Sequence, residues 1–129
     1  MKTIDFIENT DKFLEEALST LRKKGREYAT DENFFANFEQ AIGISFCDTK
    51  EAVLWHYLTK HLQSVKDMIN TVEVGGRIHG HFDTKHINEK IGDSINYLLI
   101  LRAMLEDRVE EYTVNKLNEK SYEESRNFL

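Results

Sequence analysis

The chain of 129 residues is 40% apolar and 31% charged, a balance that fits one globular domain and excludes a disordered polypeptide. It contains no proline and 6 glycines, so we expect long, uninterrupted helices. The formal net charge of −6 argues against a surface that binds nucleic acid by neutralising its phosphates. A small anionic ligand can still bind, because a local pocket or a metal ion can override the overall sign.

The N-terminal residues Met1 to Phe6 include charged side chains and no apolar run, so we expect neither a signal peptide nor a membrane anchor. The single cysteine, Cys47, cannot form an internal disulfide bond, which favours a reducing compartment. The predicted location is therefore the cytoplasm, or the host cytoplasm for a viral protein.

Two helices are predicted in the first third of the chain. Apolar side chains recur at steps of three and four residues over 5–24, which predicts an amphipathic helix that ends near Gly25. After a short polar segment, residues 34–42 predict a second, shorter helix with Asp31 as its N-cap.

The clearest predicted helix covers residues 48–72. Asp48 and Glu51 form a start that resembles a capping box. One apolar stripe at helical spacing then follows, made of Leu54, Leu58, Leu62, Val65, Ile69 and Val72.

A segment rich in glycine and histidine, residues 73–84, predicts a loop or a short hairpin with Gly75 and Gly76 at the turn. The last long helix is predicted from residue 83 or 84 to about Tyr112, and the polar residues 113–129 form either a further helix or a tail. The fold class that these elements predict is all-α: an antiparallel four-helix bundle-like single domain over residues 1–112.

The last helix carries the most informative pattern. One side is an apolar stripe typical of a core, made of Ile87, Ile91, Ile95, Leu98 and Leu105. Another side carries Glu89, Asp93, Asn96 and Tyr97 and continues to Ile100 and Met104. A helix that is apolar on both sides is usually buried on both sides, so we expect the polar group to face a cleft.

Glu89 and Asp93 are one helical turn apart and could share a Mg²⁺ ion, which prefers carboxylate oxygens and leaves positions for substrate phosphates. The alternative is a solvated first turn, where the helix dipole favours negative charge. Two lysines could contact such phosphates. Lys60 lies at the edge of the third helix's stripe, and Lys24 lies near the end of the first helix beside Tyr28. Ordinary solvent-exposed lysines are the alternative for both.

The histidine-rich segment allows a second metal hypothesis. His79, His81, Asp83 and His86 lie within eight residues, and loop histidines can converge on zinc. A merely polar loop is the alternative. The sequence has no glycine-rich phosphate loop, no nucleophile elbow and no cysteine pair, so no catalytic nucleophile is assigned.

Four segments in order resemble the small phage branch of the MazG-like all-α nucleoside triphosphate pyrophosphohydrolases. They are Glu27-Tyr28, residues 36–41 (ANFEQA), Lys60, and residues 89–97 (EKIGDSINY). Members of that branch show a tyrosine turn, an Asn-Phe helix start, a helix with a lysine, and then two acids four residues apart followed by a tyrosine. The similarity runs from about Lys24 to Leu105.

The resemblance implies a helical, often dimeric or tetrameric protein in which Mg²⁺ on helix carboxylates binds the phosphates of a nucleotide. By this similarity Glu89 and Asp93 are metal ligands, and Lys60 is a phosphate contact. The candidate nucleotide-binding residues are Lys24, Tyr28, Asn37, Lys60, Asn96 and Tyr97.

The implied activity is Mg²⁺-dependent hydrolysis of a nucleoside triphosphate to the monophosphate and pyrophosphate. The chain departs from the family where better-known members carry Glu-Glu followed by another Glu, because Glu15-Glu16 is here followed by Ser19. An incomplete carboxylate set predicts the alternative: a protein that binds a nucleotide or signalling nucleotide without cleaving it, such as a viral counter-defence sponge. A helical assembly protein with no small-molecule site is the third hypothesis.

We also expect a homo-oligomer that associates through the long helices. Large apolar side chains exceed what one core stripe per helix requires, and exposed clusters of this kind often mark an interface. These side chains are Phe34, Phe35, Phe46, Trp55 and Tyr57.

Overall fold

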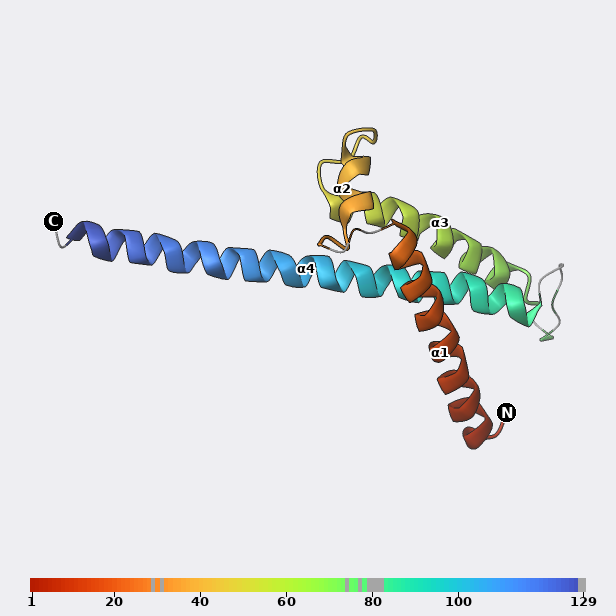
Figure 1. Cartoon of the computed structure of the whole chain (residues 1–129). Coiled ribbons are helices and arrows are strands. Elements are labelled where there is room, and N and C mark those ends of the chain that lie inside the picture. The colour runs from red at the N-terminus through yellow and green to blue at the C-terminus, as the bar shows by residue number, and fades with distance from the viewer. Residues whose placement is uncertain (29, 31, 74, 77, 79–82, 128–129) are drawn as a thin grey trace.

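The structure, a computed structural model, consists of four helices: α1 (Thr3–Tyr28), α2 (Ala36–Ile42), α3 (Lys50–Asn70) and α4 (Thr84–Asn127) (Figure 1). It describes the whole chain except residues 29, 31, 74, 77, 79–82 and 128–129, and the side chain of residue 28. The predicted all-α fold class is confirmed. In the described part of the chain, the one β-type pairing outside the helices is an isolated antiparallel bridge between Val72 and Ile78.

The helices are arranged around the N-terminal half of α4. α3 runs antiparallel to α4, since Glu51 near its start pairs with Arg108, and His61 further along pairs with Asp93. α1 crosses α4 at a steep angle, and its N-terminal turns project away from the other helices (Figure 1). The C-terminal half of α4 projects beyond α2 and α3 along the axis of α4, away from the rest of the chain (Figure 1). None of the helices within the described ranges is long and apolar enough to cross a membrane.

The helix boundaries differ from the prediction at three places. α1 does not end near Gly25 but continues to Tyr28. α3 is capped by Thr49, whose hydroxyl accepts a hydrogen bond from the Ala52 N–H at 3.1 Å, so the predicted Asp48 cap is wrong. The polar residues 113–127, for which helix and tail were both open, continue α4. The predicted Asp31 cap lies outside the described residues.

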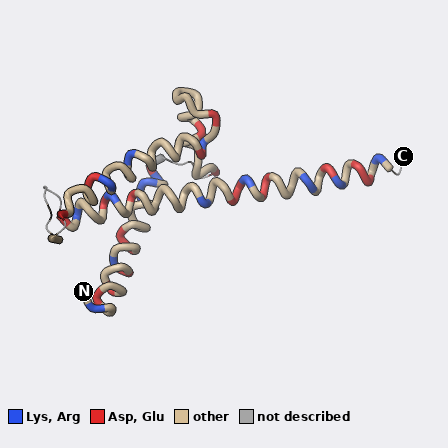
Figure 2. The backbone as a smooth tube through the Cα atoms, turned by 180° about the vertical axis from the view of Figure 1, so that it is seen from behind, with Lys and Arg blue, Asp and Glu red and all other residues tan. Residues whose placement is uncertain are grey.

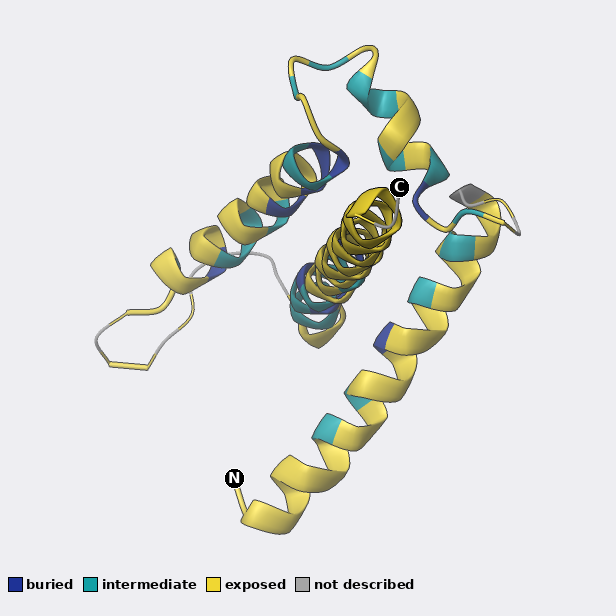
Figure 3. Ribbon diagram, turned by 90° about the vertical axis from the view of Figure 1, so that its left-hand side faces the viewer, coloured by how far each residue is buried: buried dark blue, intermediate teal, exposed yellow. Residues whose placement is uncertain are grey.

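The hydrophobic core is small. Phe35, Leu54 and Met104 form its centre, and partly buried side chains of α2 and α4 pack around them. Figure 3 shows that burial is confined to the sides of the helices that face one another. The predicted core stripe of α4 is wrong in part, because Leu98 and Leu105 are about half exposed. Nothing within the described chain covers that side of α4 fully.

The aromatic side chains expected at an oligomer interface do not form one surface. Phe35 is buried in the core, while Phe34 and Tyr57 line a cavity described below. Phe46 and Trp55 are exposed. The predicted homo-oligomer therefore needs a different surface from the one that these residues suggested.

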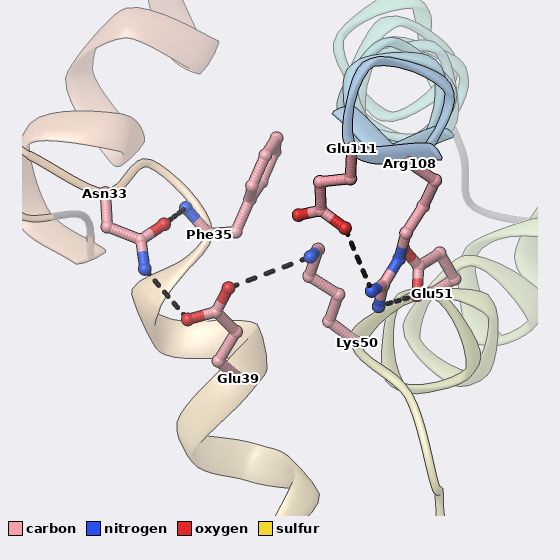
Figure 4. A network of polar contacts seen from close by, with 7 residues as sticks. All are labelled: Asn33, Phe35, Glu39, Lys50, Glu51, Arg108 and Glu111. Atoms are coloured by element: carbon pink, nitrogen blue, oxygen red, sulfur yellow. Dashed lines mark hydrogen bonds and ion pairs between the residues drawn. The ribbon is translucent and has the colours of Figure 1, made fainter. Parts of the chain in front are cut away.

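A polar network fixes α2 and α4 to the start of α3 (Figure 4). The Arg108 guanidinium donates two hydrogen bonds to the Glu51 carboxylate, at 2.9 and 3.2 Å. The buried Lys50 ammonium lies 3.8 Å from the Glu39 carboxylate, which in turn accepts a hydrogen bond from the Asn33 amide at 2.8 Å. These contacts hold the turn that precedes α2, and with it Phe34, in place.

Candidate functional site

A cavity of about 360 Å³ opens where the end of α1 meets α2, α3 and α4. We call it the aromatic cavity, because four of its lining side chains are the rings of Phe34, Phe38, Tyr57 and Tyr97. Its polar lining consists of Lys24, Asn37, Asp93 and Asn96. Leu21, Gly25 and Ile100 complete the walls. A largely apolar cavity with a few converging polar groups is typical of a small-molecule site.

The structure brings together most of the residues singled out from the sequence. Lys24 from α1, Asn37 from α2, and Asp93, Asn96 and Tyr97 from α4 all line the aromatic cavity. They are up to 73 positions apart in the chain, between Lys24 and Tyr97, so only the fold makes them neighbours.

Two candidate residues lie elsewhere, and the structure does not describe the side chain of a third. Lys60 is exposed on α3 and does not line the aromatic cavity. Glu89 is exposed and lines a second cavity instead. The side chain of Tyr28 lies outside the described part of the chain.

The Asp93 carboxylate faces the two basic side chains of the site, Lys24 and His61. Its two carboxylate oxygens lie 3.7 Å from Lys24 Nζ and 3.8 Å from His61 Nδ1, and its side chain is 15% exposed. Partial burial lowers the pKa of His61, against the opposing effect of the Asp93 charge. His61 is therefore mostly neutral at neutral pH, and Lys24 is the main countercharge of Asp93.

A row of rings connects α2, α3 and α4 along the wall of the aromatic cavity. The ring centroids of Phe38 and Tyr57 are 6.1 Å apart, those of Tyr57 and Tyr97 are 6.4 Å apart, and those of Tyr97 and His61 are 5.0 Å apart. Aromatic pairs at these separations attract one another beyond their apolar burial. The row makes a continuous aromatic wall that leads to the Asp93 carboxylate.

The glycine at position 25 allows α1 to approach the aromatic wall of the cavity closely. A Cβ atom at this position would lie 2.8 Å from Cε2 of the Phe34 ring, closer than ordinary packing permits. The absence of a side chain at Gly25 therefore lets the Phe34 ring pack against α1 as part of the cavity lining. This requirement, rather than a helix end, accounts for the glycine.

Asn96 ties α4 to α1 beneath the cavity. Its amide Nδ2 donates a hydrogen bond of 2.9 Å to the backbone carbonyl of Ala17. Its other polar atom, Oδ1, is buried and has no hydrogen-bond partner among the described residues. A buried acceptor without a donor is costly, so a ligand donor would find a favourable partner at this position.

A second cavity, of about 500 Å³, lies beside the first where α1 crosses α4. We call it the acidic cavity, because it is lined by the carboxylates of Glu16, Glu89 and Asp93. Lys24, Asp93 and Asn96 line both cavities and form the boundary between them. Lys85 lies at the other end of the acidic cavity.

The carboxylates of the acidic cavity do not form a closed metal cage. Among the side chains that the structure describes, no group of three His, Cys, Asp or Glu lies close enough to hold a metal ion. Magnesium does not require such a cage, since it is commonly held by one or two carboxylates together with waters and substrate phosphates. Glu89 and Asp93, one turn apart on α4, fit that donor set. The loop residues His79 and His81 of the zinc hypothesis lie outside the described residues.

Several lining residues had no place in the sequence-based candidate set. The sequence pattern predicts Phe34 at an oligomer interface and predicts no site role for Phe38 or Gly25. His61 does not line the cavity but contacts Asp93 and Tyr97 beside it, and it is also absent from that set. The available signal is the spacing of Phe34 and Phe38, four residues apart, which places both on one side of the helix predicted over 34–42, although Phe34 precedes α2 in the structure.

Comparison of the chain with protein-family models, with curated proteins and with solved structures found no match. The similarity to MazG-like proteins consequently depends on the motif residues of the chain itself.

Proposed function

We propose that this chain binds a nucleotide, with the base in the aromatic cavity and the phosphates in the acidic cavity, in the manner of a MazG-like nucleoside triphosphate pyrophosphohydrolase. The observation that carries the proposal is the meeting of Lys24, Asn37, Asp93, Asn96 and Tyr97 around one cavity. Helical spacing along the last helix and motif similarity make these residues candidates from the sequence, and neither brings the three helices together. Their convergence supports a common ligand.

The aromatic cavity suits a planar heterocycle. Its volume of about 360 Å³ lies within the range of small-ligand pockets, about 300–1,000 Å³. The rings of Phe38, Tyr57 and Tyr97 offer flat apolar surface for stacking. The amides of Asn37 and Asn96 offer hydrogen bonds to the polar edge of a base.

The acidic cavity suits metal-bound phosphates. Lys24 and Lys85 would attract the phosphate oxygens, and Glu89 and Asp93 would hold Mg²⁺. The bound ion would neutralise phosphate charge during the release of pyrophosphate. Lys24 would then exchange its contact with Asp93 for a phosphate oxygen, since its ammonium lies at the boundary of both cavities.

A second candidate function is nucleotide binding without hydrolysis. It is favoured by the surroundings of Asp93, whose two oxygens already face Lys24 and His61. It is also favoured by the exposure of Glu89, because water is free to solvate this carboxylate. A sponge-like protein would need the aromatic cavity and Lys24 but no metal.

A panel of natural and modified nucleoside triphosphates tests both functions. Calorimetry measures binding with and without Mg²⁺, and pyrophosphate release measures hydrolysis. The informative variants are Lys24→Met, in the site, and Lys60→Met, an exposed lysine of α3 outside the aromatic cavity. We expect Lys24→Met to weaken binding by about tenfold or more, because a charge-assisted phosphate contact is lost, and Lys60→Met to bind normally.

The outcomes separate the hypotheses. Binding with Mg²⁺-dependent pyrophosphate release that Asp93→Asn abolishes supports the hydrolase. Binding with full recovery of the intact nucleotide supports the sponge. If no nucleotide binds to the folded protein, or if the two lysine variants behave alike, the site assignment is wrong.

A further inference from the structure

Three features of the aromatic cavity attract positive charge. The first is the row of rings Phe38, Tyr57 and Tyr97, because the face of an aromatic ring is its negative part. The second is the Asp93 carboxylate to which this row leads. Its side chain is only 15% exposed, so water screens its charge less than it would at the surface. The third is the side chain of Asn96, which lines the cavity about one turn further along α4.

Asn96 contributes because its amide can face only one way. Its Nδ2 donates a hydrogen bond to the backbone carbonyl of Ala17, a group that can only accept, so the remaining atom is Oδ1. Oδ1 is buried and has no donor among the described residues. The negative end of the amide dipole is therefore uncompensated beside the cavity, and a positive charge in the cavity would stabilise it.

The cation that the chain itself supplies compensates these groups only weakly. Lys24 is the one cationic side chain among the described residues that line the aromatic cavity. Its ammonium lies 3.7 Å from the Asp93 carboxylate, beyond the range of a hydrogen bond, and its side chain is 55% exposed. Water screens such a pair. In the proposed complex the phosphates compete for the same ammonium, so Asp93 loses its main countercharge when a nucleotide binds.

Two rings of the row also differ from a tyrosine elsewhere in the chain. Lys116 Nζ lies 5.5 Å from the ring centroid of Tyr112, within the range of a cation–π contact. In the part of the chain that the structure describes, no lysine or arginine lies in this way over Phe38 or Tyr57. Both rings line the aromatic cavity, so a cation over them has to come from a ligand.

We propose, on the basis of the nucleotide binding proposed above, that the preferred nucleotide carries a positively charged base, one that is alkylated on a ring nitrogen. Methylation of guanine at N7 gives such a base, with the charge delocalised over a flat ring. This ring stacks on Phe38 and Tyr57 as a neutral base does and gains the cation–π attraction in addition. Its charge also replaces that of Lys24 near the Asp93 carboxylate.

The experiment compares three triphosphates by calorimetry, at a slightly acidic pH that keeps the methylated guanine charged. They are guanosine triphosphate, its N7-methyl derivative, and 7-methyl-7-deazaguanosine triphosphate, which has the shape of the N7-methyl derivative without its charge. We expect the charged compound to bind about tenfold more tightly than either of the others. Adenosine triphosphate and its positively charged N1-methyl derivative repeat the comparison for the other purine.

Tyr57→Leu tests the contribution of the row, and Tyr112→Leu is the matched control outside both cavities. Tyr57→Leu keeps an apolar side chain but removes the ring, so the preference for the charged base should fall by about threefold. Tyr112→Leu and Tyr57→Phe should keep the full preference. Circular dichroism checks that each variant is folded. An unchanged preference in folded Tyr57→Leu contradicts the proposal.

The affinities of the wild-type chain separate this proposal from the proposed function. If the neutral nucleotides bind and the charged ones bind no more tightly, the proposal is overturned and the nucleotide site stands. Equal affinity for the two methylated guanine compounds also overturns it, because the methyl group and not the charge then accounts for any gain. If none of these purine nucleotides binds, the charged purine is excluded, and the wider triphosphate panel decides separately whether the chain binds nucleotides.

Discussion

The two halves of α4 share one continuous helical backbone but have opposite surroundings. In the first half Gly92, Ser94, Asn96 and Met104 are buried against α1 and α3. In the second half every residue from 105 to 127 is exposed. Figure 2 shows charges of both signs distributed along this second half.

The difference follows from what holds each half in a helix. Glycine, serine and asparagine are weak helix formers, so the first half depends on packing against its neighbours. The second half is rich in Glu, Lys and Arg, which favour helix, and it carries pairs such as Lys116–Glu119 at 3.6 Å. Candidate functional residues thus occur where packing, and not helix propensity, dictates the residue type.

Removal of a buried side chain from the first half of α4 should lower the free energy of unfolding far more than a similar removal from the second half. Met104→Ala deletes a side chain with no exposed surface at the centre of the core, and it should lower the free energy of unfolding by about 2–5 kcal/mol. Val114→Ala, in the exposed half, should change it by less than about 0.5 kcal/mol. Urea unfolding followed by circular dichroism measures both. Equal losses would show that the second half is packed as firmly as the first, contrary to the structure.

The fold class and the existence of four helices could be predicted from the sequence because helical periodicity is a local property. The length of α4 could not, because the polar residues beyond Tyr112 lack an apolar stripe although they favour helix individually. The half-exposed state of Leu98 and Leu105 could not be predicted either. Periodicity shows that a side is apolar but does not show whether this chain or another one covers it.

The candidate site could be predicted in part. Asp93, Asn96 and Tyr97 are close in sequence, so their helical spacing placed them on neighbouring sides of one helix. Lys60 is predicted near them from its place at the edge of the third helix's apolar stripe and from family similarity, but the structure leaves it exposed outside the aromatic cavity. Phe34 reaches the cavity, and His61 reaches Asp93, through the way the segment before α2 and the helix α3 pack, which no local pattern encodes.

Two glycine substitutions compare a position that has room for a methyl group with one that does not. Gly92 of α4 has room for it against α1, and Gly25 of α1 does not, because Phe34 is too close. In Gly92→Ala the new Cβ would lie 3.5 Å from Phe13 and 3.6 Å from Ala17, which is ordinary contact. Alanine is the better helix former, so this variant should gain up to about 1 kcal/mol in stability. In Gly25→Ala the gain is offset because Phe34 must move, and nucleotide affinity should fall by about tenfold.

Thermal unfolding and calorimetry with the nucleotide found to bind best measure the two effects. The two variants make the same chemical change in helices that meet each other, so they control for the general effect of alanine. If Gly25→Ala binds the nucleotide as tightly as wild type, Phe34 is not part of the ligand site. If Gly92→Ala unfolds more easily than wild type, the crossing of α1 over α4 is tighter than the structure indicates.

The smallest expected effect concerns the ion pair between Arg108 and Glu51, which lies where the packed half of α4 ends. The hydrogen bonds from Arg108 are the main cause that lowers the pKa of Glu51 below its ordinary value of 4.5. The unfolded chain then binds a proton at a higher pH than the folded chain does. Glu51 therefore contributes stability that is present in full above about pH 4.5 and is lost as the pH falls through the lower folded pKa.

Glu51→Gln should accordingly be less stable than wild type at neutral pH, and the difference should narrow as the pH falls below about 4.5. Urea unfolding midpoints between about pH 7 and pH 3 measure it. Glu119→Gln removes the exposed pair with Lys116 in the projecting half, and it should have little effect at any pH because water screens such pairs. A difference for Glu51→Gln that stays constant with pH would mean that the carboxylate acts through packing alone. The junction between the two halves of α4 would then not depend on the charge of Glu51.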